Sequence, residues 1–195
     1  MRYKYLLLFV LGLCASCGEP RRPDYVITQT GDTVIGGKRD TLPSAIPDSA
    51  GYFTKVPIGN LCPEQLVTFA NTLKGTPYKY ASTDPAEGFD CSGFITYVFN
   101  HFGIKVPRRS FDFVHVDHEV KISNAKPGDL ILFTGTDSTD REVGHMGIVV
   151  SKPGDTVSFI HSTSGKGKGV VITPFNSYYA GRYVKTIRIF PQNDR

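Results

Sequence analysis

One cysteine and two histidines are the residues of this sequence whose types and spacing could do chemistry. Cys91 lies in the stretch EGFDCSGFITYVF, where loop-forming residues give way to an apolar pattern typical of a helix. His145 opens the β-rich run HMGIVV, and His161 ends the run VSFIH. A thiol is a nucleophile when a base takes its proton, and a third polar group can orient that base. One histidine could therefore take the thiol proton while the other sets the tautomer of the ring.

The position of Cys91 at the start of a predicted helix favours this chemistry. The helix should begin at or near Asp90, Cys91 and Ser92 and should stop at Gly103. Backbone N–H groups without partners and the positive end of the helix dipole lie there. Both favour a thiolate, so we expect the pKa of Cys91 to be lowered. The apolar stripe that indicates the helix consists of Phe94, Ile95, Val98, Phe99 and Phe102.

Cys91 could instead be a structural residue, in either of two ways. A single cysteine in a core often acts as a small hydrophobic residue. An exported protein could also pair Cys91 with Cys62 in a disulfide.

The elements around these residues predict an α+β fold, with N-terminal helices packed on an antiparallel β-sheet. A first helix should start at Pro63 and stop before Gly75, because apolar residues recur there at helical spacing. After Pro127 the pattern changes to short β-rich runs separated by turn residues. Helices followed by strands are typical of this class. In an antiparallel sheet the runs that carry His145 and His161 should be neighbours, with both histidines at one end.

The N-terminal part of the chain has the features of export. Residues 1–16 combine basic residues, a short apolar run and small residues, as in a secretory signal peptide. The sequence LCASC resembles the lipobox of bacterial lipoproteins, with Cys17 as the residue to be acylated. Residues 17–57 are rich in proline and glycine and predict a tether, in which YVITQTGDTVI could form a small hairpin.

Composition limits the remaining possibilities. The 195 residues, 40% of them hydrophobic, suit one domain, which we place at residues 58–195. The net charge of +4 is spread along the chain, which argues against a nucleic-acid partner. The five histidines and four cysteines show no spacing typical of a metal site, and no cofactor is implied.

The ordered motifs of residues 62–190 resemble those of NlpC-type cell-wall cysteine peptidases. They are KGTPYKYASTDPAEGFDCSGFITYVFNHFGIKVPRRS, KPGDLILF, VGHMGIVV and FIHSTSGKGKGVVI. The resemblance implies a papain-like fold and hydrolysis of peptidoglycan stem peptides, most often at the γ-D-glutamyl to diamino-acid bond. It implies that Cys91 is the nucleophile, His145 the base and His161 the polar third member.

The resemblance also implies residues that bind substrate. Tyr78 matches a tyrosine whose hydroxyl lies near the nucleophile, and Asp90 and Ser92 match positions that hold the free amine of a stem peptide in some members. The chain departs from the family in two places, both where a cleft rim would lie. Ala81 and Ser82 replace a usual Gly-Gly pair, and the polar segment 134–143 is inserted before His145.

Arg108 and Ser110, in VPRRSFDF, are further candidates for substrate binding, since arginine suits the planar geometry of carboxylates. Two alternatives to the peptidase remain. The same cysteine and histidine could serve an N-acetylmuramoyl-L-alanine amidase or a lipid acyltransferase, or the chain could be a non-catalytic, lipid-anchored wall-binding module. The expected partners are stem peptides and a membrane bound through the lipid anchor. Because no aspartate follows Cys17, we expect an outer-membrane protein that faces the periplasm, and we expect a monomer.

Overall fold

A computed structural model describes residues 25–27, 33–35 and 55–195, apart from positions 138 and 167. The chain divides into two units, Met1–Arg39 and Asp40–Arg195, and each is described by itself. In the first unit, β1 (Tyr25–Ile27) and β2 (Thr33–Ile35) pair as an antiparallel hairpin, with Tyr25 opposite Ile35. The hairpin lies where the sequence predicts one. The predicted signal peptide and Cys17, the predicted site of acylation, lie outside the described residues.

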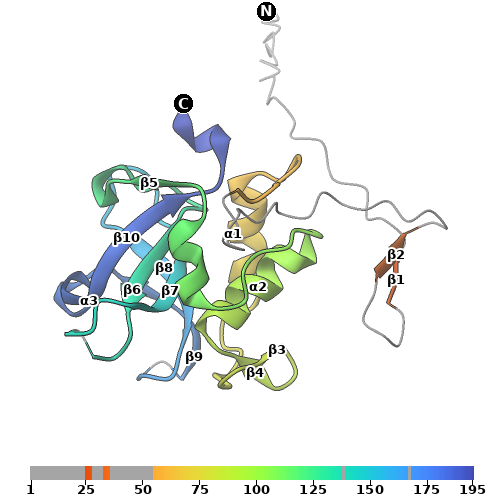
Figure 1. The fold of residues 1–195 in the computed structure, drawn as a ribbon, viewed down its shortest axis with the longest axis horizontal. Coiled ribbons are helices and arrows are strands. Elements are labelled where there is room, and N and C mark those ends of the chain that lie inside the picture. The colour runs from red at the N-terminus through yellow and green to blue at the C-terminus, as the bar shows by residue number, and fades with distance from the viewer. Residues whose placement is uncertain (1–24, 28–32, 36–54, 138, 167) are drawn as a thin grey trace, which may run out of the picture. The chain divides into compact units, whose positions relative to one another are not determined.

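The second unit is built around a six-stranded antiparallel sheet (Figure 1). Its strand order is β5-β10-β6-β7-β8-β9, which confirms the antiparallel arrangement expected from the sequence. The strands are β5 (His118–Val120), β6 (Leu130–Thr134), β7 (Val143–Val149), β8 (Ser158–Thr163), β9 (Gly169–Pro174) and β10 (Tyr183–Arg188). A separate small ladder joins β3 (Thr83–Asp84) to β4 (Gly88–Phe89) just before the cysteine.

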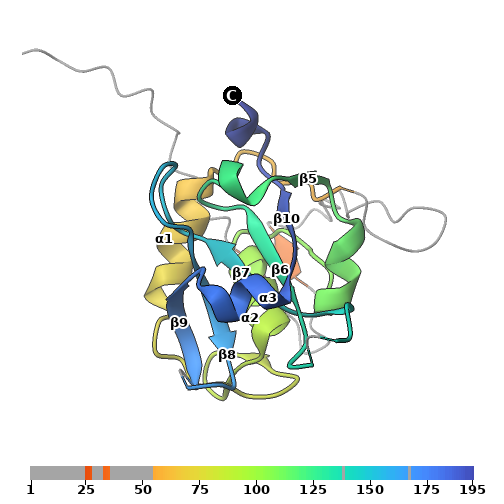
Figure 2. The same ribbon diagram turned by 90° about the vertical axis from the view of Figure 1, so that its left-hand side faces the viewer.

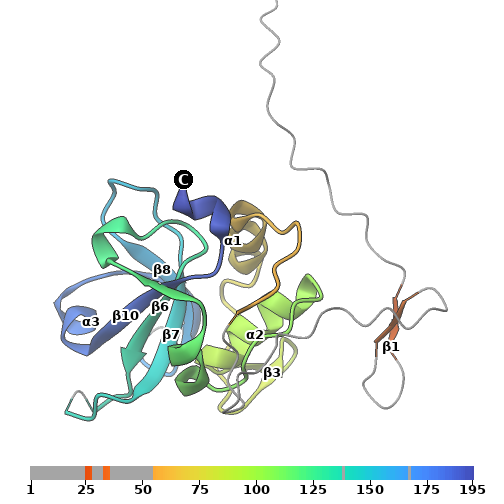
Figure 3. The same ribbon diagram turned by 45° about the horizontal axis from the view of Figure 1, so that its top comes forward.

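Helices cover both faces of this sheet. On one face lie α1 (Pro63–Thr72) and α2 (Cys91–His101), side by side in Figures 1 and 3. On the other face lies the short α3 (Ser177–Arg182), which crosses the strands in Figure 2. Three 3₁₀ helices complete the unit: η1 (Ser110–His115), η2 (Ile122–Asn124) and η3 (Pro191–Asp194).

The alternation of side chains along each strand explains the two apolar layers. Leu130 and Leu132 of β6 join the larger core under α1 and α2, whereas Ile131 and Phe133 join a smaller core with Tyr179 of α3. A strand that is buried on both faces reads as a continuous apolar run, as LILF does. Among the described residues, no helix is both long enough and apolar enough to cross a membrane.

The two helix starts follow the predicted signals. Pro63 occupies the first turn of α1, and the backbone N–H of Cys62 donates to Oε1 of Gln65 at 3.0 Å. In α2 the carboxylate of Asp90 is the N-cap and accepts the backbone N–H of Gly93 at 2.6 Å. The predicted start of the second helix at Asp90–Ser92 is therefore confirmed.

Gly93 is required where the chain folds back over the first turn of α2. A Cβ atom at this position would lie 2.1 Å from the carbonyl oxygen of Ser82 and 2.9 Å from Oδ1 of Asp90. Ser82 also accepts the backbone N–H of Asp90 at 3.2 Å, so neither segment can move without losing a contact. The glycine of the DCSG motif thus permits the turn that positions the thiol.

We predict that Gly93→Ala destabilises the protein by about 1–3 kcal/mol, because the added methyl group overlaps a backbone atom. Thermal unfolding of both proteins measures this. Gly181→Ala is the matched control, since a Cβ atom there meets nothing within 4 Å. Equal stabilities of Gly93→Ala and the unmodified chain would contradict this packing of Ser82 against α2.

Candidate active site

Cys91 is the first residue of α2, and its thiol lies against the start of β7. Sγ is 3.8 Å from the carbonyl oxygen of Gly144, the residue before His145. The hydroxyl of Ser162, next to His161, donates to the carbonyl of Phe89 at 2.7 Å and joins β8 to the segment before the cysteine. Cys91 is a partly buried free thiol, and no disulfide joins it to Cys62. The alternative of a Cys62–Cys91 disulfide is therefore wrong.

The two candidate histidines face each other across neighbouring strands, as the sequence predicts. Nε2 of His145 is 2.8 Å from Nδ1 of His161. Nε2 of His161 in turn lies 2.9 Å from the hydroxyl of Thr173 on β9. Gly147 makes the pair possible, because a Cβ atom there would lie 2.7 Å from the ring of Phe159 and 3.2 Å from Cβ of His161. Nδ1 of His145 is the ring nitrogen left for the thiol.

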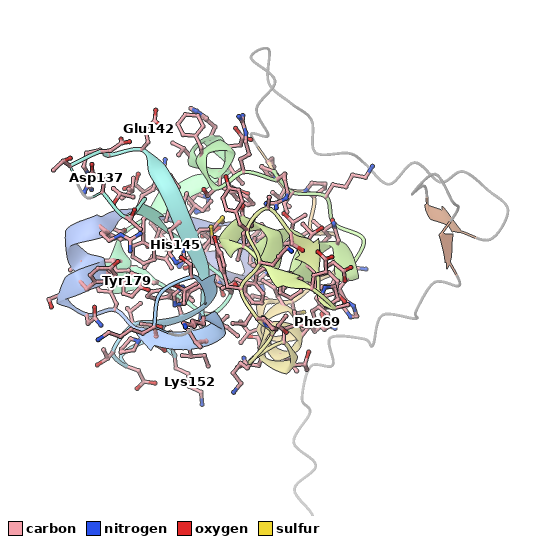
Figure 4. The ribbon with its side chains drawn as sticks, turned by 90° about the horizontal axis from the view of Figure 1, so that it is seen from below. Phe69, Asp137, Glu142, His145, Lys152 and Tyr179 are labelled. Atoms are coloured by element: carbon pink, nitrogen blue, oxygen red, sulfur yellow. The ribbon has the colours of Figure 1, made fainter. Side chains whose placement is uncertain are left out.

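Residues of α3 cover the histidine pair. The ring of Tyr179 packs edge-on against His161, with the ring centres 5.7 Å apart. It also stacks near His145, and Figure 4 labels both of these residues. Arg182 is buried in the same helix and donates to the carbonyl of Thr134 at 2.8 Å. This cover keeps water away from the rings on that side.

Burial keeps both histidines neutral. It lowers the pKa of His145 well below the usual 6.5, and the charges of His161 and Arg182 lower it further. Burial and then Arg182 lower the pKa of His161 to about 4. A neutral imidazole at pH 7 can accept a proton, so His145 is available as a base.

The electrostatics of Cys91 correct the expectation from the sequence. Burial raises the pKa of the thiol, and the negative charge of Asp90 raises it further. The backbone N–H groups of Ser92 and Cys91 and the charge of Arg108 lower the pKa, but by less. The prediction of a preformed thiolate is therefore wrong: the helix start acts as expected, but desolvation and the capping carboxylate outweigh it. The thiol needs a base at the moment of attack.

We predict that alkylation of Cys91 by iodoacetamide stays slow at about pH 6 to 7 and speeds up only above the pH at which an ordinary cysteine thiol ionises, because the pKa of Cys91 is raised. Mass spectrometry of the peptide that contains Cys91 measures the rate. Asp90→Asn should move the rise to lower pH, because it removes a negative charge while asparagine still caps the helix. A rate that is already maximal at neutral pH, or that ignores Asp90→Asn, would contradict this assignment.

Asp90, Ser92 and Arg108 form one hydrogen-bonded cluster beside the thiol. The guanidinium of Arg108 donates to both carboxylate oxygens of Asp90, at 3.1 and 2.7 Å, and to the hydroxyl of Ser92 at 3.0 Å. The cluster thus unites three of the predicted substrate-binding residues. Carboxylate binding by Arg108 stays a prediction, as does amine binding by Asp90 and Ser92.

The other two predicted binding residues flank the cluster. The backbone of Tyr78 pairs with that of Phe89, and burial, followed by the charges of Cys91 and Asp90, raises the pKa of the Tyr78 phenol. The phenol therefore keeps its proton and can donate a hydrogen bond. The hydroxyl of Ser110 donates to the carbonyl of Val143 at 3.4 Å, so it ties η1 to β7, and its substrate role stays a prediction.

The two departures from the family pattern have structural counterparts. Ala81 has φ +59, in the left-handed region that glycine favours, which explains a glycine at this position in relatives. Arg141, in the inserted segment, donates to the carbonyls of Gly181 and Tyr183 at 3.2 and 2.6 Å. The insertion is thereby fastened to the end of α3.

Thr173, Tyr179 and Arg182 are site residues that sequence reasoning missed. One signal could have found Thr173: alternation along β9 places it on the same face as Val171, which lies opposite His161. Nothing in the local sequence indicates that α3 returns over the histidines.

Comparisons with known proteins agree with this geometry. Residues 75–188 match the model of the NlpC/P60 family. The chain is 39% identical over 128 residues to the gamma-DL-glutamyl hydrolase of Bacillus subtilis, a match that covers 65% of this chain and 30% of that protein. It is 27% identical to the probable endopeptidase NlpC homolog of Haemophilus influenzae, covering 94% of this chain and 97% of the relative. The murein DD-endopeptidase MepS/murein LD-carboxypeptidase of Escherichia coli K12 is 31% identical, covering 62% of this chain and 59% of that protein.

Solved structures show the same fold. An NlpC/P60 family protein from Bacillus cereus superposes with a TM-score of 0.58 at 30% identity, covering 67% of this chain and 41% of that one. The NlpC/p60 domain of the peptidoglycan hydrolase SagA superposes with a TM-score of 0.53 at 27% identity, covering 66% and 99%. The α+β arrangement predicted from the sequence is thus shared with papain-like domains.

Proposed function

This chain belongs to the NlpC/P60 family, and from that membership we propose that it is a cysteine peptidase that cuts the stem peptides of bacterial peptidoglycan. The observation that carries the proposal is the arrangement of the free thiol of Cys91, at a helix start, against the strand of a hydrogen-bonded histidine pair. Relatives named as endopeptidases and as a gamma-DL-glutamyl hydrolase support the same class of reaction.

The proposed mechanism is acyl transfer through Cys91. His145 takes the thiol proton as sulfur attacks the carbonyl carbon of the peptide bond, and His161 orients the His145 ring. The imidazolium then gives its proton to the leaving amine as the carbon–nitrogen bond breaks. Water, activated by the neutral His145, hydrolyses the thioester and restores the thiol.

The oxyanion of the tetrahedral intermediate needs donors at the helix start. The backbone N–H groups of Cys91 and Ser92 already interact with the thiol, and the protonated phenol of Tyr78 is a further donor. These hydrogen-bond donors are already present in the protein without substrate. They support an acyl-transfer reaction rather than a purely structural cysteine.

We propose that the cut falls at the γ-D-glutamyl to diamino-acid bond, and the name gamma-DL-glutamyl hydrolase of one relative supports a γ-glutamyl bond. The relative named murein DD-endopeptidase/LD-carboxypeptidase makes cuts at other stem-peptide bonds the second candidate. Digestion of purified peptidoglycan, followed by mass spectrometry of the products, separates them. Disaccharides that keep only L-Ala and D-Glu support the first bond, uncrosslinked intact stems support the second, and free whole stems would indicate an amidase.

The envelope location is a separate proposal. Acylation of Cys17 would hold the enzyme on a membrane surface, since each buried methylene contributes about 0.8 kcal/mol. We propose the outer membrane, facing the periplasm. Cys17→Ala should release the protein from the membrane fraction of cells, and retention of this variant would overturn the anchor.

A further inference from the structure

The hydrogen bonding of the histidine pair continues beyond His161. The next group is Thr173, whose hydroxyl lies 2.9 Å from Nε2 of His161, the nitrogen that does not face His145. Thr173 lies opposite Phe159 and Val171 lies opposite His161, so Thr173 is a diagonal neighbour of the histidine on the same face. The result is a continuous row of hydrogen-bonding groups from Thr173 through His161 to His145.

The row can be protonated in two ways when both rings are neutral, because each neutral ring has one donor and one acceptor nitrogen. In the first, Nε2–H of His161 donates to Thr173, Nδ1 of His161 accepts from Nε2–H of His145, and Nδ1 of His145 carries a lone pair. In the second, every hydrogen bond is reversed and Nδ1 of His145 carries a proton. Only the first arrangement leaves His145 able to take the thiol proton.

The protonated form of His145 that arises during the reaction requires the same direction of hydrogen bonds as the first arrangement. Once His145 has taken a proton, both of its nitrogens are donors, so Nδ1 of His161 must accept. The single proton of His161 must then be on Nε2, where it faces Thr173. A hydroxyl oxygen can accept it, whereas an apolar side chain cannot.

We propose that Thr173 is a positioning residue whose hydroxyl oxygen accepts the Nε2–H of His161 and thereby holds His145 in the base-competent tautomer. This inference rests on the proposed Cys91–His145 chemistry. Thr173 touches neither substrate nor the reacting atoms. It acts through His161.

The surroundings of His161 support this role. Its side chain is fully buried, and the rings of Phe159 and Tyr179 pack against it with centres 4.8 and 5.7 Å away. The positive charge of Arg182 and burial hold the pKa of His161 at about 4, so the ring has only one proton to place at neutral pH.

Kinetics of Thr173→Val test the proposal, because valine keeps the shape of threonine but removes the hydroxyl. Leaving a buried donor unpaired should lower kcat by about tenfold to a hundredfold while KM changes by less than about twofold. Thr173→Ser should restore kcat. Thr72→Val is the matched control, since that hydroxyl bonds only within exposed α1 and its loss should leave kcat unchanged.

A second measurement does not depend on activity. Nitrogen-15 spectra of the histidine rings at pH 7 distinguish protonated from unprotonated nitrogens, and variants of single histidines assign the signals. We expect the proton of His161 on Nε2 in the unmodified protein and a mixture of tautomers in Thr173→Val. A proton on Nδ1 of His161, or a Thr173→Val variant with unchanged kcat and spectrum, would overturn the proposal.

The two measurements also separate this inference from the proposed function. If the chain cleaves no stem peptide, the function fails but the spectra still show which tautomer Thr173 selects. If Thr173→Val does not fold, the spectrum of the unmodified chain and the kcat of Thr173→Ser decide the matter.

Discussion

Cys91→Ala is expected to lower the rate of stem-peptide cleavage by roughly 10⁴-fold or more, because no acyl-enzyme forms without the thiol. The fold should survive this change. The thiol is partly exposed, and its contact with the carbonyl oxygen of Gly144, at 3.8 Å, is weak. Alanine is also the best helix former, so the free energy of unfolding should change by less than about 1 kcal/mol.

Release of product from purified peptidoglycan measures the loss, and thermal unfolding verifies the fold. Cys62→Ala is the matched control, since Cys62 is also a cysteine but is buried at the start of α1, where its backbone N–H donates to Gln65. This control should keep its activity. If Cys91→Ala retained a tenth of the original rate, Cys91 would not be the nucleophile.

His145→Gln is expected to lower kcat by about 10²–10⁴-fold, the usual contribution of a general base. The effect should be large here because the pKa of Cys91 is raised, so the thiol carries its proton at neutral pH and depends on a base. In the variant only hydroxide can remove that proton. Its residual activity should therefore keep rising with pH until the thiol itself ionises.

The unmodified enzyme should show a different pH profile. The pKa of His145 lies well below 6.5, so the base stays neutral as the pH falls from 7 to 6, and kcat/KM should hold over that interval. A second profile, of His118→Gln, serves as control, because His118 lies on β5 and pairs with Asp117 and Asp194 away from the thiol. A His145→Gln enzyme within tenfold of the original, or with the same pH profile, would contradict the assignment of the base.

Much of the fold was predictable because its signals are local. A proline at the first turn and apolar residues at helical spacing predicted α1, and a second apolar stripe that ends at a glycine predicted α2. Short β-rich runs separated by turns predicted neighbouring antiparallel strands, and hence the meeting of His145 and His161. The chemical identity of the nucleophile and its partners could be inferred from the sequence for this reason.

The protonation state of the site was not predictable. A helix start lowers the pKa of a thiol in isolation, but the sequence does not show how deeply the thiol is buried or that the carboxylate of the neighbouring Asp90 turns back to cap the helix. Those two effects raise the pKa of Cys91 and reverse the expectation. Desolvation depends on every segment that covers a group, so it appears only in the folded chain.

The supporting contacts also depend on tertiary structure. Arg108 meets Asp90 across 18 positions of sequence, and Thr173 meets His161 because β9 pairs with β8. Arg182 reaches the histidines because α3 folds over the opposite face of the sheet from α2. The sequence by itself determined the candidates for the reacting residues, since helix starts and strand patterns are encoded within a few positions. Only the folded structure decided which of them carry protons, because burial and the placing of distant charges set the free energy of each charged form.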